Sequence, residues 1–148
     1  TESYARAPAY RYKCHSSGDG CGEELSSSAR YMRSRGSCIF CDLLRDELAD
    51  GRRIVAENAL FVAFIPFFAR YPYEVHVMPR QHLTCLSELD PSQRVAFAEI
   101  LKAVTTGYDK LFDFSFPYVM IIHQAPTDGE GHGHYHFHVE FYPPPEHS

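Results

Sequence analysis

The segment 134–142 constrains the fold of this chain more than any other part, because two kinds of side chain alternate along it. One set is large and apolar: Tyr135, Phe137, Val139 and Phe141. The other set is polar: His134, His136, His138 and Glu140. Successive side chains of a β-strand point to opposite faces of its sheet, so the segment predicts a strand with one core face. Buried neutral imidazoles need partners and charged ones repel each other, so we interpret the opposite face as functional.

Periodicity and turn residues predict the other elements. Strands are expected at 53–57, 60–65, 73–78, 118–123 and 135–142, and helices at 23–33, 42–49 and 91–112. The longest helix begins with a capping Asp90 and Pro91, and its apolar stripe is Phe97, Leu101, Val104, Tyr108 and Leu111. The nearly all-apolar segment 118–123 is expected at the centre of the sheet. We predict an α+β fold, an antiparallel sheet of about five strands with one long amphipathic helix and short N-terminal helices.

The composition limits the domain organisation and the classes of partner. The 148 residues are 45% apolar, which suits one domain, and we expect a flexible leader over 1–22 followed by the domain over 23–148. There are 14 Lys and Arg against 19 Asp and Glu, and no basic run, so we expect no nucleic-acid partner. No apolar run is long enough to cross a membrane. An odd count of five cysteines and a start unlike a signal peptide favour the cytoplasm.

The Cys-x-x-Cys pair, Cys38 and Cys41, is a candidate metal clip. Two thiolates and two distant imidazoles commonly complete a tetrahedral zinc site. We expect such a zinc site to consist of Cys38, Cys41, His82 and His134. The structural alternative is a pair of buried thiols beside an exposed histidine.

Three residues outside the histidine strand are candidates for substrate binding. Asn58 can face a ribose or a base, although an asparagine in a turn often serves its own backbone. Phe67 can stack on a base, although aromatic residues are also common in a core. Arg80 can pair with a phosphate.

Several motifs in order resemble one enzyme family. The histidine strand is similar to the His-apolar-His-apolar-His signature of the histidine-triad superfamily. Further motifs resemble the C-terminal half of galactose-1-phosphate uridylyltransferases over about Glu23 to Pro144: Cys38–Cys41, Met78–His82, Pro66–Glu74, His123–Pro126 and Phe141–Pro144. The resemblance implies nucleotidyl transfer between UDP-glucose and galactose 1-phosphate.

The resemblance also implies partners and a second metal. The family joins two histidine-triad-like halves, and its nucleophilic histidine lies in a His-Pro-His-Gly-Gln motif that this sequence does not contain. We therefore expect a homodimer or an assembly with an N-terminal-half chain. The family pattern implies a second site, for zinc or iron, formed by Glu24, His123, His138 and Glu140.

Two alternative functions remain open from the residues. In a stand-alone histidine-triad nucleotide hydrolase, His136 would attack the α-phosphorus while His138 and His123 bind the phosphoryl oxygens. The other alternative is a catalytically silent metal-binding subunit.

Overall fold

A computed structural model describes residues 20–142, and it has the predicted α+β architecture. The helices are α1 (Gly20–Arg35), α2 (Ile39–Asp50) and α3 (Pro91–Phe112), with a short 3-10 turn, η2, at Leu86–Glu88. The strands are β1 (Ile54–Glu57), β2 (Phe61–Phe64), β3 (Val75–Pro79), β4 (Val119–His123) and β5 (His138–Tyr142). They form one antiparallel sheet in the order β1-β2-β3-β5-β4. The leader expected over 1–22 lies, for residues 1–19, outside the described part.

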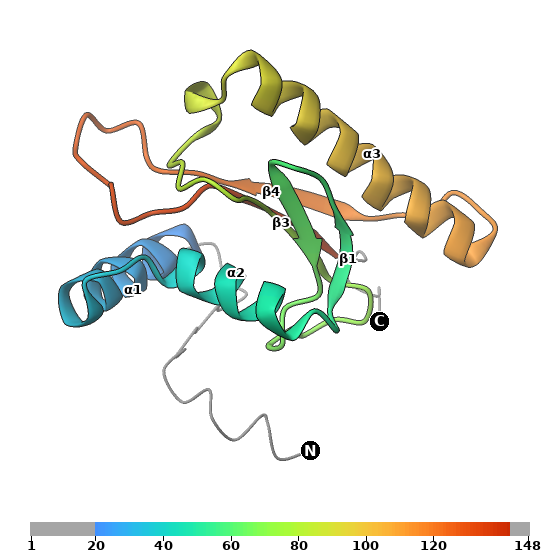
Figure 1. The fold of residues 1–148 in the computed structure, drawn as a ribbon, viewed down its shortest axis with the longest axis horizontal. Helices are drawn as coiled ribbons and strands as arrows, with labels where there is room; N and C mark the ends of the chain where they lie inside the picture. The colour runs from blue at the N-terminus through green and yellow to red at the C-terminus, as the bar shows by residue number, and fades with distance from the viewer. Residues whose placement is uncertain (1–19, 143–148) are drawn as a thin grey trace.

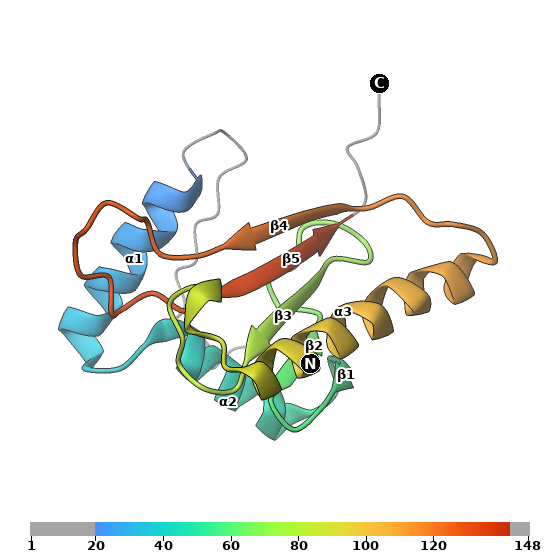
Figure 2. The same ribbon diagram turned by 90° about the horizontal axis from the view of Figure 1, so that it is seen from above.

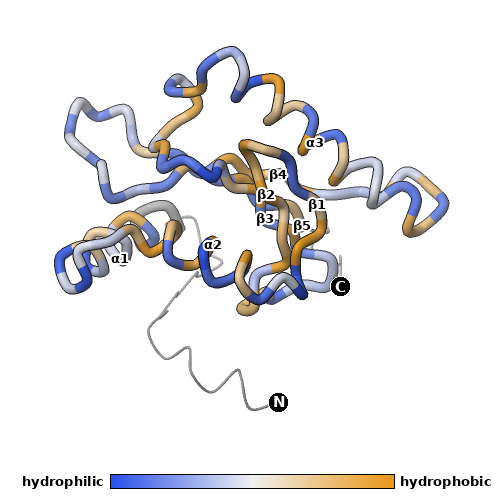
Figure 3. The backbone as a smooth tube through the Cα atoms, in the orientation of Figure 1, coloured by the Kyte–Doolittle hydropathy of each residue, from blue (hydrophilic) through white to orange (hydrophobic). Residues whose placement is uncertain are grey.

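The sheet is covered by helices on both faces (Figure 1). Helix α3 packs on one face over a core that includes Val77, Phe137 and Val139. Helices α1 and α2 cover the other face, where Phe40 and Tyr135 belong to a second core (Figure 2). Figure 3 shows the hydrophobic positions gathered on the strands and on the helix surfaces that meet them. Each face of the sheet therefore has its own apolar core.

Helix α3 begins where the sequence predicts. The Asp90 carboxylate accepts the Gln93 backbone N–H at 2.7 Å, and the Gln93 side chain accepts the Asp90 N–H at 2.9 Å, so the capping box is complete. The buried stripe includes Val104 and Tyr108 as expected, but Leu111 is 61% exposed. Leu111 lies in the last turn, beyond the part of the helix that the sheet covers.

The predicted central position of β4 is wrong, because β4 is an edge strand that pairs only with β5 in the sheet. Met120 and Ile122 pair with Phe141 and Val139, which lie in the core under α3, yet both are exposed. An apolar run predicts burial of both faces, but here the covering helix does not reach the last strand.

Strand β5 is shorter than predicted, and its first residues do not alternate as a strand. Pairing begins at His138, so residues 134–137 precede the ladder. Phe137, Val139 and Phe141 lie in the α3 core, as the alternation predicts. Tyr135 instead belongs to the core beneath α1 and α2. The histidines ahead of the strand must therefore be placed individually.

Helix α2 begins at Ile39, earlier than the expected Asp42. Its N-cap is Cys38, so both cysteines of the Cys-x-x-Cys pair lie at the helix start. The helix ends at Gly51, which adopts the left-handed conformation with φ 75°. Among the described helices, none is both long and apolar enough to cross a membrane.

Two candidate metal centres

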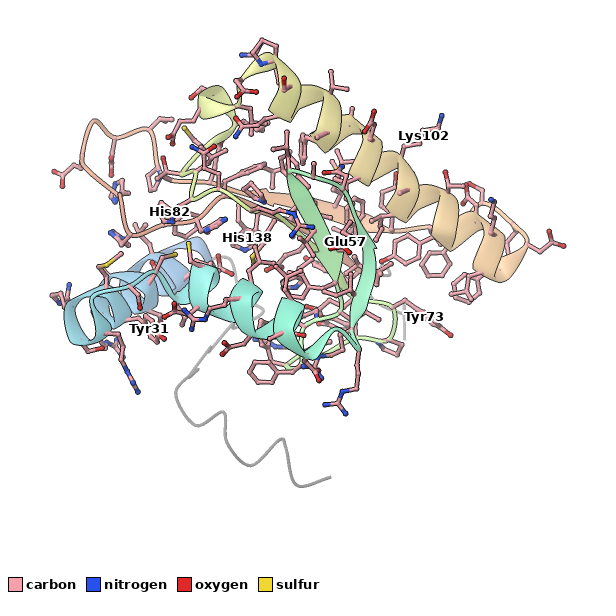
Figure 4. All side chains as sticks on the ribbon, viewed as in Figure 1. Tyr31, Glu57, Tyr73, His82, Lys102 and His138 are labelled. Carbon is pink, nitrogen blue, oxygen red and sulfur yellow. The ribbon has the colours of Figure 1, made fainter. Side chains whose placement is uncertain are left out.

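Within the described part of the chain, two groups of four side chains have the composition of metal sites. The thiolate cluster consists of Cys38, Cys41, His82 and His136. The carboxylate cluster consists of Glu24, His123, His138 and Glu140. In each group the candidate ligand atoms lie within 4.8 Å of one another. Figure 4 shows His82 and His138, one from each cluster, between the sheet and the helices α1 and α2.

The thiolate cluster forms at the N-terminus of α2. Cys41 Sγ lies 3.3 Å from Nδ1 of His82 and 3.3 Å from Nδ1 of His136, and Cys38 Sγ lies 4.0 Å from the latter nitrogen. The Cys41 thiol donates to Cys38 and lowers the pKa of Cys38 to about 4, whereas the same bond raises the pKa of Cys41. A helix N-terminus also favours a thiolate. One sulfur is therefore prepared as an anionic ligand.

Backbone carbonyls fix the tautomers of both imidazoles in this cluster. His82 Nε2 lies 2.7 Å from the Gly133 oxygen, and His136 Nε2 lies 3.0 Å from the Pro79 oxygen. A carbonyl oxygen only accepts hydrogen bonds, so these nitrogens carry the protons. The Nδ1 lone pairs then face the sulfurs. A metal-ligating histidine is typically held in this way by its second nitrogen.

The carboxylate cluster joins three elements that are distant in sequence. Glu24 lies on α1, His123 ends β4, and β5 supplies the other two residues. His123 lies 3.3 Å from Glu24 Oε2 through Nδ1 and 3.3 Å from Glu140 Oε2 through Nε2. His138 Nε2 lies 3.8 Å from Glu24 Oε2 and 3.5 Å from Glu140 Oε1. The two imidazole rings stack, with centroids 4.7 Å apart.

The electrostatics of the carboxylate cluster suit a cation. Burial opposes ionisation of Glu24, but His123 and His138 outweigh it and lower the pKa of Glu24 to about 2. Burial likewise opposes protonation of His123, yet Glu140 and Glu24 raise its pKa to about 10. Within residues 24–142, three atoms of the cluster are buried and have no hydrogen-bond partner: His123 Nε2, His138 Nε2 and Glu140 Oε1. A metal ion that replaced the His123 proton would satisfy all three atoms.

Further contacts hold these ligands in place. The Tyr135 hydroxyl donates to Glu24 Oε2 at 2.7 Å. Nδ1 of His138 donates to the backbone oxygen of His136 at 2.9 Å, so its Nε2 faces the cluster. The ring of Phe40, from between the two cysteines, packs 4.9 Å from the ring of His138. The two clusters are thus adjacent and share supporting residues.

Comparison with known proteins identifies the family. Residues 24–147 match the family described as "Galactose-1-phosphate uridyl transferase, C-terminal domain". The chain belongs to this family. It is 42% identical over 122 residues to a galactose-1-phosphate uridylyltransferase of Thermotoga maritima, covering 82% of this chain and 38% of the relative. It is also 42% identical over 114 residues to that of Haemophilus influenzae, covering 77% of this chain and 33% of the relative.

Solved structures support the family assignment. A uridylyltransferase structure superposes with a TM-score of 0.77 at 34% identity, covering 82% of this chain and 38% of that one. A HIT family protein from Bacillus anthracis has a TM-score of 0.51 at 20% identity, covering 72% of each chain, which supports the shared fold alone. The chain spans well under half the length of the curated relatives it matches.

The structure places His136, and not the expected His134, beside the two cysteines. His134 lies ahead of β5, and its ring contacts that of His132 instead, with centroids 5.9 Å apart. The structure does not present His136 as the exposed nucleophile that the histidine-triad alternative needs. Its ring is completely buried, and its two nitrogens face Cys41 and the Pro79 oxygen.

The structure also argues against phosphoryl binding by His123 and His138. Both imidazoles lie between the carboxylates of Glu24 and Glu140, which would repel an anionic phosphoryl group. Both histidines belong instead to the carboxylate cluster.

The three predicted substrate-binding residues make internal contacts in this domain. Asn58 Oδ1 accepts the backbone N–H groups of Leu60 and Phe61, and its Nδ2 donates to the Ala96 oxygen. Asn58 therefore shapes the β1–β2 turn and ties it to α3, in place of the expected substrate contact.

Arg80 pairs with Glu57 at 2.8 Å, so its guanidinium braces the same hairpin instead of standing free for a phosphate. Phe67 is half-buried and packs edge-on against Phe68, with centroids 5.1 Å apart. Both residues therefore have structural contacts, and for Phe67 a place in the core was the alternative interpretation of the sequence.

Sequence reasoning missed two residues beside the carboxylate cluster, Glu74 and His76. Both are buried on or next to β3, and His76 pairs in register with Glu140. Their two-residue spacing before Pro79 indicated a shared strand face, but the neighbour of β3 in the sheet could not be known from the sequence.

Proposed function

We propose that this chain is the C-terminal part of an enzyme that transfers a uridylyl group between UDP-glucose and galactose 1-phosphate. The proposal depends on one observation, the family match over residues 24–147. The identity of 42% to the Thermotoga maritima uridylyltransferase over 82% of this chain supports it. Relatives of much lower identity would support only a shared fold.

The proposed transferase needs a second half. The chain matches only 38% of the length of the Thermotoga maritima relative, and its sequence holds no His-Pro-His-Gly-Gln motif. Because His136 is completely buried, it does not offer the exposed imidazole that a nucleotidyl intermediate requires. The nucleophile therefore comes from an N-terminal half, either in a hetero-assembly or within a dimer of the joined halves.

The same proposal includes two metals. Zinc suits the thiolate cluster, because two sulfurs and two imidazoles form a closed structural site. Zinc or iron suits the carboxylate cluster of two imidazoles and two carboxylates. A metal in each would act as a cross-link, because each set of ligands comes from several elements of the fold. The free thiols of Cys38, Cys41 and Cys85 are consistent with a reducing compartment, and we propose the cytoplasm.

The test combines this chain with a chain that carries the His-Pro-His-Gly-Gln half. We expect exchange between UDP-glucose and galactose 1-phosphate only when both are present, with the covalent uridylyl label on the partner. The control is each chain assayed alone. Label on this chain alone, lost in His136→Asn and kept in His138→Asn, would instead establish a stand-alone nucleotide hydrolase.

A silent metal-binding subunit is the second candidate. It is favoured by the engagement of both His136 and His138 in the two clusters, which leaves neither for chemistry on a substrate. Stoichiometric metal, with no exchange in the presence of the partner half, would support it.

A further inference from the structure

The five-stranded sheet has two edges, and its two edge strands are built differently. Strand β1 forms one edge and β4 forms the other (Figure 2). An open edge presents unpaired backbone N–H and C=O groups, which natural proteins protect with bulges or charged side chains. β1 has both devices, because its register with β2 shifts between Ile54 and Ala56 and the strand ends with the charged Glu57. The β1 edge is therefore protected against pairing with another strand.

The β4 edge has neither device. Its five residues, Val119–His123, pair with β5 in an unbroken register. The strand contains no lysine, arginine, aspartate, glutamate or proline. Within residues 20–142, no strand pairs with its outer edge. The outer backbone groups of β4 are therefore available to a further strand.

The side chains of β4 on the α3 side of the sheet are apolar and exposed. Met120 is 44% exposed and Ile122 is 39% exposed, yet their register partners Phe141 and Val139 are completely buried. Tyr118, just before the strand, is 42% exposed. The apolar core beneath α3 therefore stops one strand short of the edge. A further strand with apolar side chains on this side would remove these surfaces from water and extend the core.

The length of the relatives indicates what occupies this edge. The chain covers 38% of the Thermotoga maritima uridylyltransferase and matches a C-terminal domain, so most of that relative lies outside the shared region. The proposed function requires this remaining half. A permanent neighbour also explains the lack of protection, because an edge that is always covered does not need bulges or charges.

We infer that β4 is the docking strand for the N-terminal half of the enzyme, which adds a strand to the open edge and covers Met120 and Ile122 with apolar side chains. The inference rests on the proposed function, because that function supplies the partner. In the assembled enzyme β4 is then a central strand, as its nearly all-apolar sequence indicates. His123 lies on the same strand, so docking also holds one residue of the carboxylate cluster in place.

The experiment measures backbone hydrogen exchange by mass spectrometry. This chain is compared alone and in complex with a co-expressed N-terminal part of the Thermotoga maritima uridylyltransferase. Peptides that contain β4 should exchange at least ~10-fold more slowly in the complex, because their outer N–H groups gain hydrogen-bond partners. Peptides that contain β1, the protected edge, should exchange equally fast in both samples and serve as the internal control.

Substitutions at the two edges form a matched pair. Ile122→Lys places a charge at the inferred interface, and it should weaken the complex by ~30-fold or more in analytical ultracentrifugation. Val55→Lys alters a side chain of β1 that is 48% exposed, and it should leave the stability of the complex unchanged. Both side chains are exposed in this chain, so neither substitution should prevent folding.

The inference is overturned if β4 exchanges equally fast alone and in the complex, or if Ile122→Lys and Val55→Lys weaken the complex equally. Protection of β4 that rises with the concentration of this chain alone would also overturn it, by identifying a second copy as the occupant. Transferase activity of the complex separates the two proposals. Activity without protection of β4 would refute the docking strand alone, whereas protection of β4 without activity would refute the transferase and leave the docking strand.

Discussion

The thiolate and carboxylate clusters lie side by side, yet they are built in opposite ways. The thiolate cluster gathers both sulfurs from the first turn of α2, and backbone carbonyls orient its two imidazoles. The carboxylate cluster has charged ligands from α1 and β5 and an imidazole from the edge strand β4. Local geometry brings the two sulfurs of the first cluster together before distant segments add His82 and His136, whereas the second cluster takes its charged ligands from separate elements, α1 and β5. The two centres should therefore respond differently to the same kinds of perturbation.

The largest expected effect is the loss of zinc in Cys41→Ser, since its sulfur is the one close to both imidazoles. Zinc affinity should fall by more than the ~10–100-fold typical of outer partners, and the thermal midpoint should fall with it. Elemental analysis and thermal unfolding measure both. Cys85→Ser, in a thiol outside both clusters, is the matched control. Retention of one thiolate-bound zinc in Cys41→Ser would contradict the assignment.

The counterpart in the other cluster is Glu24→Gln. It removes a buried carboxylate that faces both His123 and His138, so the cation affinity of the carboxylate cluster should fall by at least ~10-fold while the thiolate cluster keeps its zinc. Glu47→Gln is the control, because Glu47 is buried but pairs with Arg53 away from both clusters. Equal cation loss in the two variants would show that general destabilisation is responsible.

The metal-free chain should lose stability in alkaline solution because of His123. Glu140 and Glu24 raise its pKa in the folded chain to about 10, from the ordinary value of 6.5. The stabilisation is therefore complete below pH 6.5 and disappears as the pH rises through 10. The expected loss is on the order of a few kcal/mol, measured by urea unfolding after chelation. His123→Gln should flatten this part of the profile, and an unchanged slope in that variant would refute the explanation.

The smallest expected effect is that of His134→Ala. Because His134 is outside the thiolate cluster, zinc content should stay within the error of the measurement, whereas His136→Ala should lose zinc. Zinc analysis of the two variants therefore distinguishes the arrangement in the structure from the ligand set expected from sequence. Loss of zinc in His134→Ala would instead support the ligand set expected from the sequence.

Local signals predicted much of the fold. The capping box at Asp90, the hairpin and the stop at Gly51 depend on residues close in sequence, and the elements formed there. The order of strands could not be predicted from these local signals. An apolar segment such as β4 suits a central strand and an edge strand equally well until the position of the covering helix is known.

For the two candidate metal centres, too, local patterns could be predicted and long-range arrangement could not. Cys38 and Cys41 could be recognised from their spacing, but the choice between His134 and His136 required the point at which β5 begins. Glu24 and His123 could be placed with Glu140 only through a family resemblance, because no spacing rule connects α1, β4 and β5. Glu74 and His76 were missed because their position beside Glu140 is set by the register between β3 and β5.

Residue 136 contributes its ring to one centre and its backbone oxygen to a ligand of the other. Ring and carbonyl have different evolutionary freedom: substitution can replace the imidazole, but every amino acid retains the oxygen. A homologue that has discarded the sulfur-bound metal can therefore still orient its second centre, provided the main chain keeps its path. An insertion between residues 136 and 138 would instead disturb both centres at once, because it would shift the ring and the carbonyl together relative to His138.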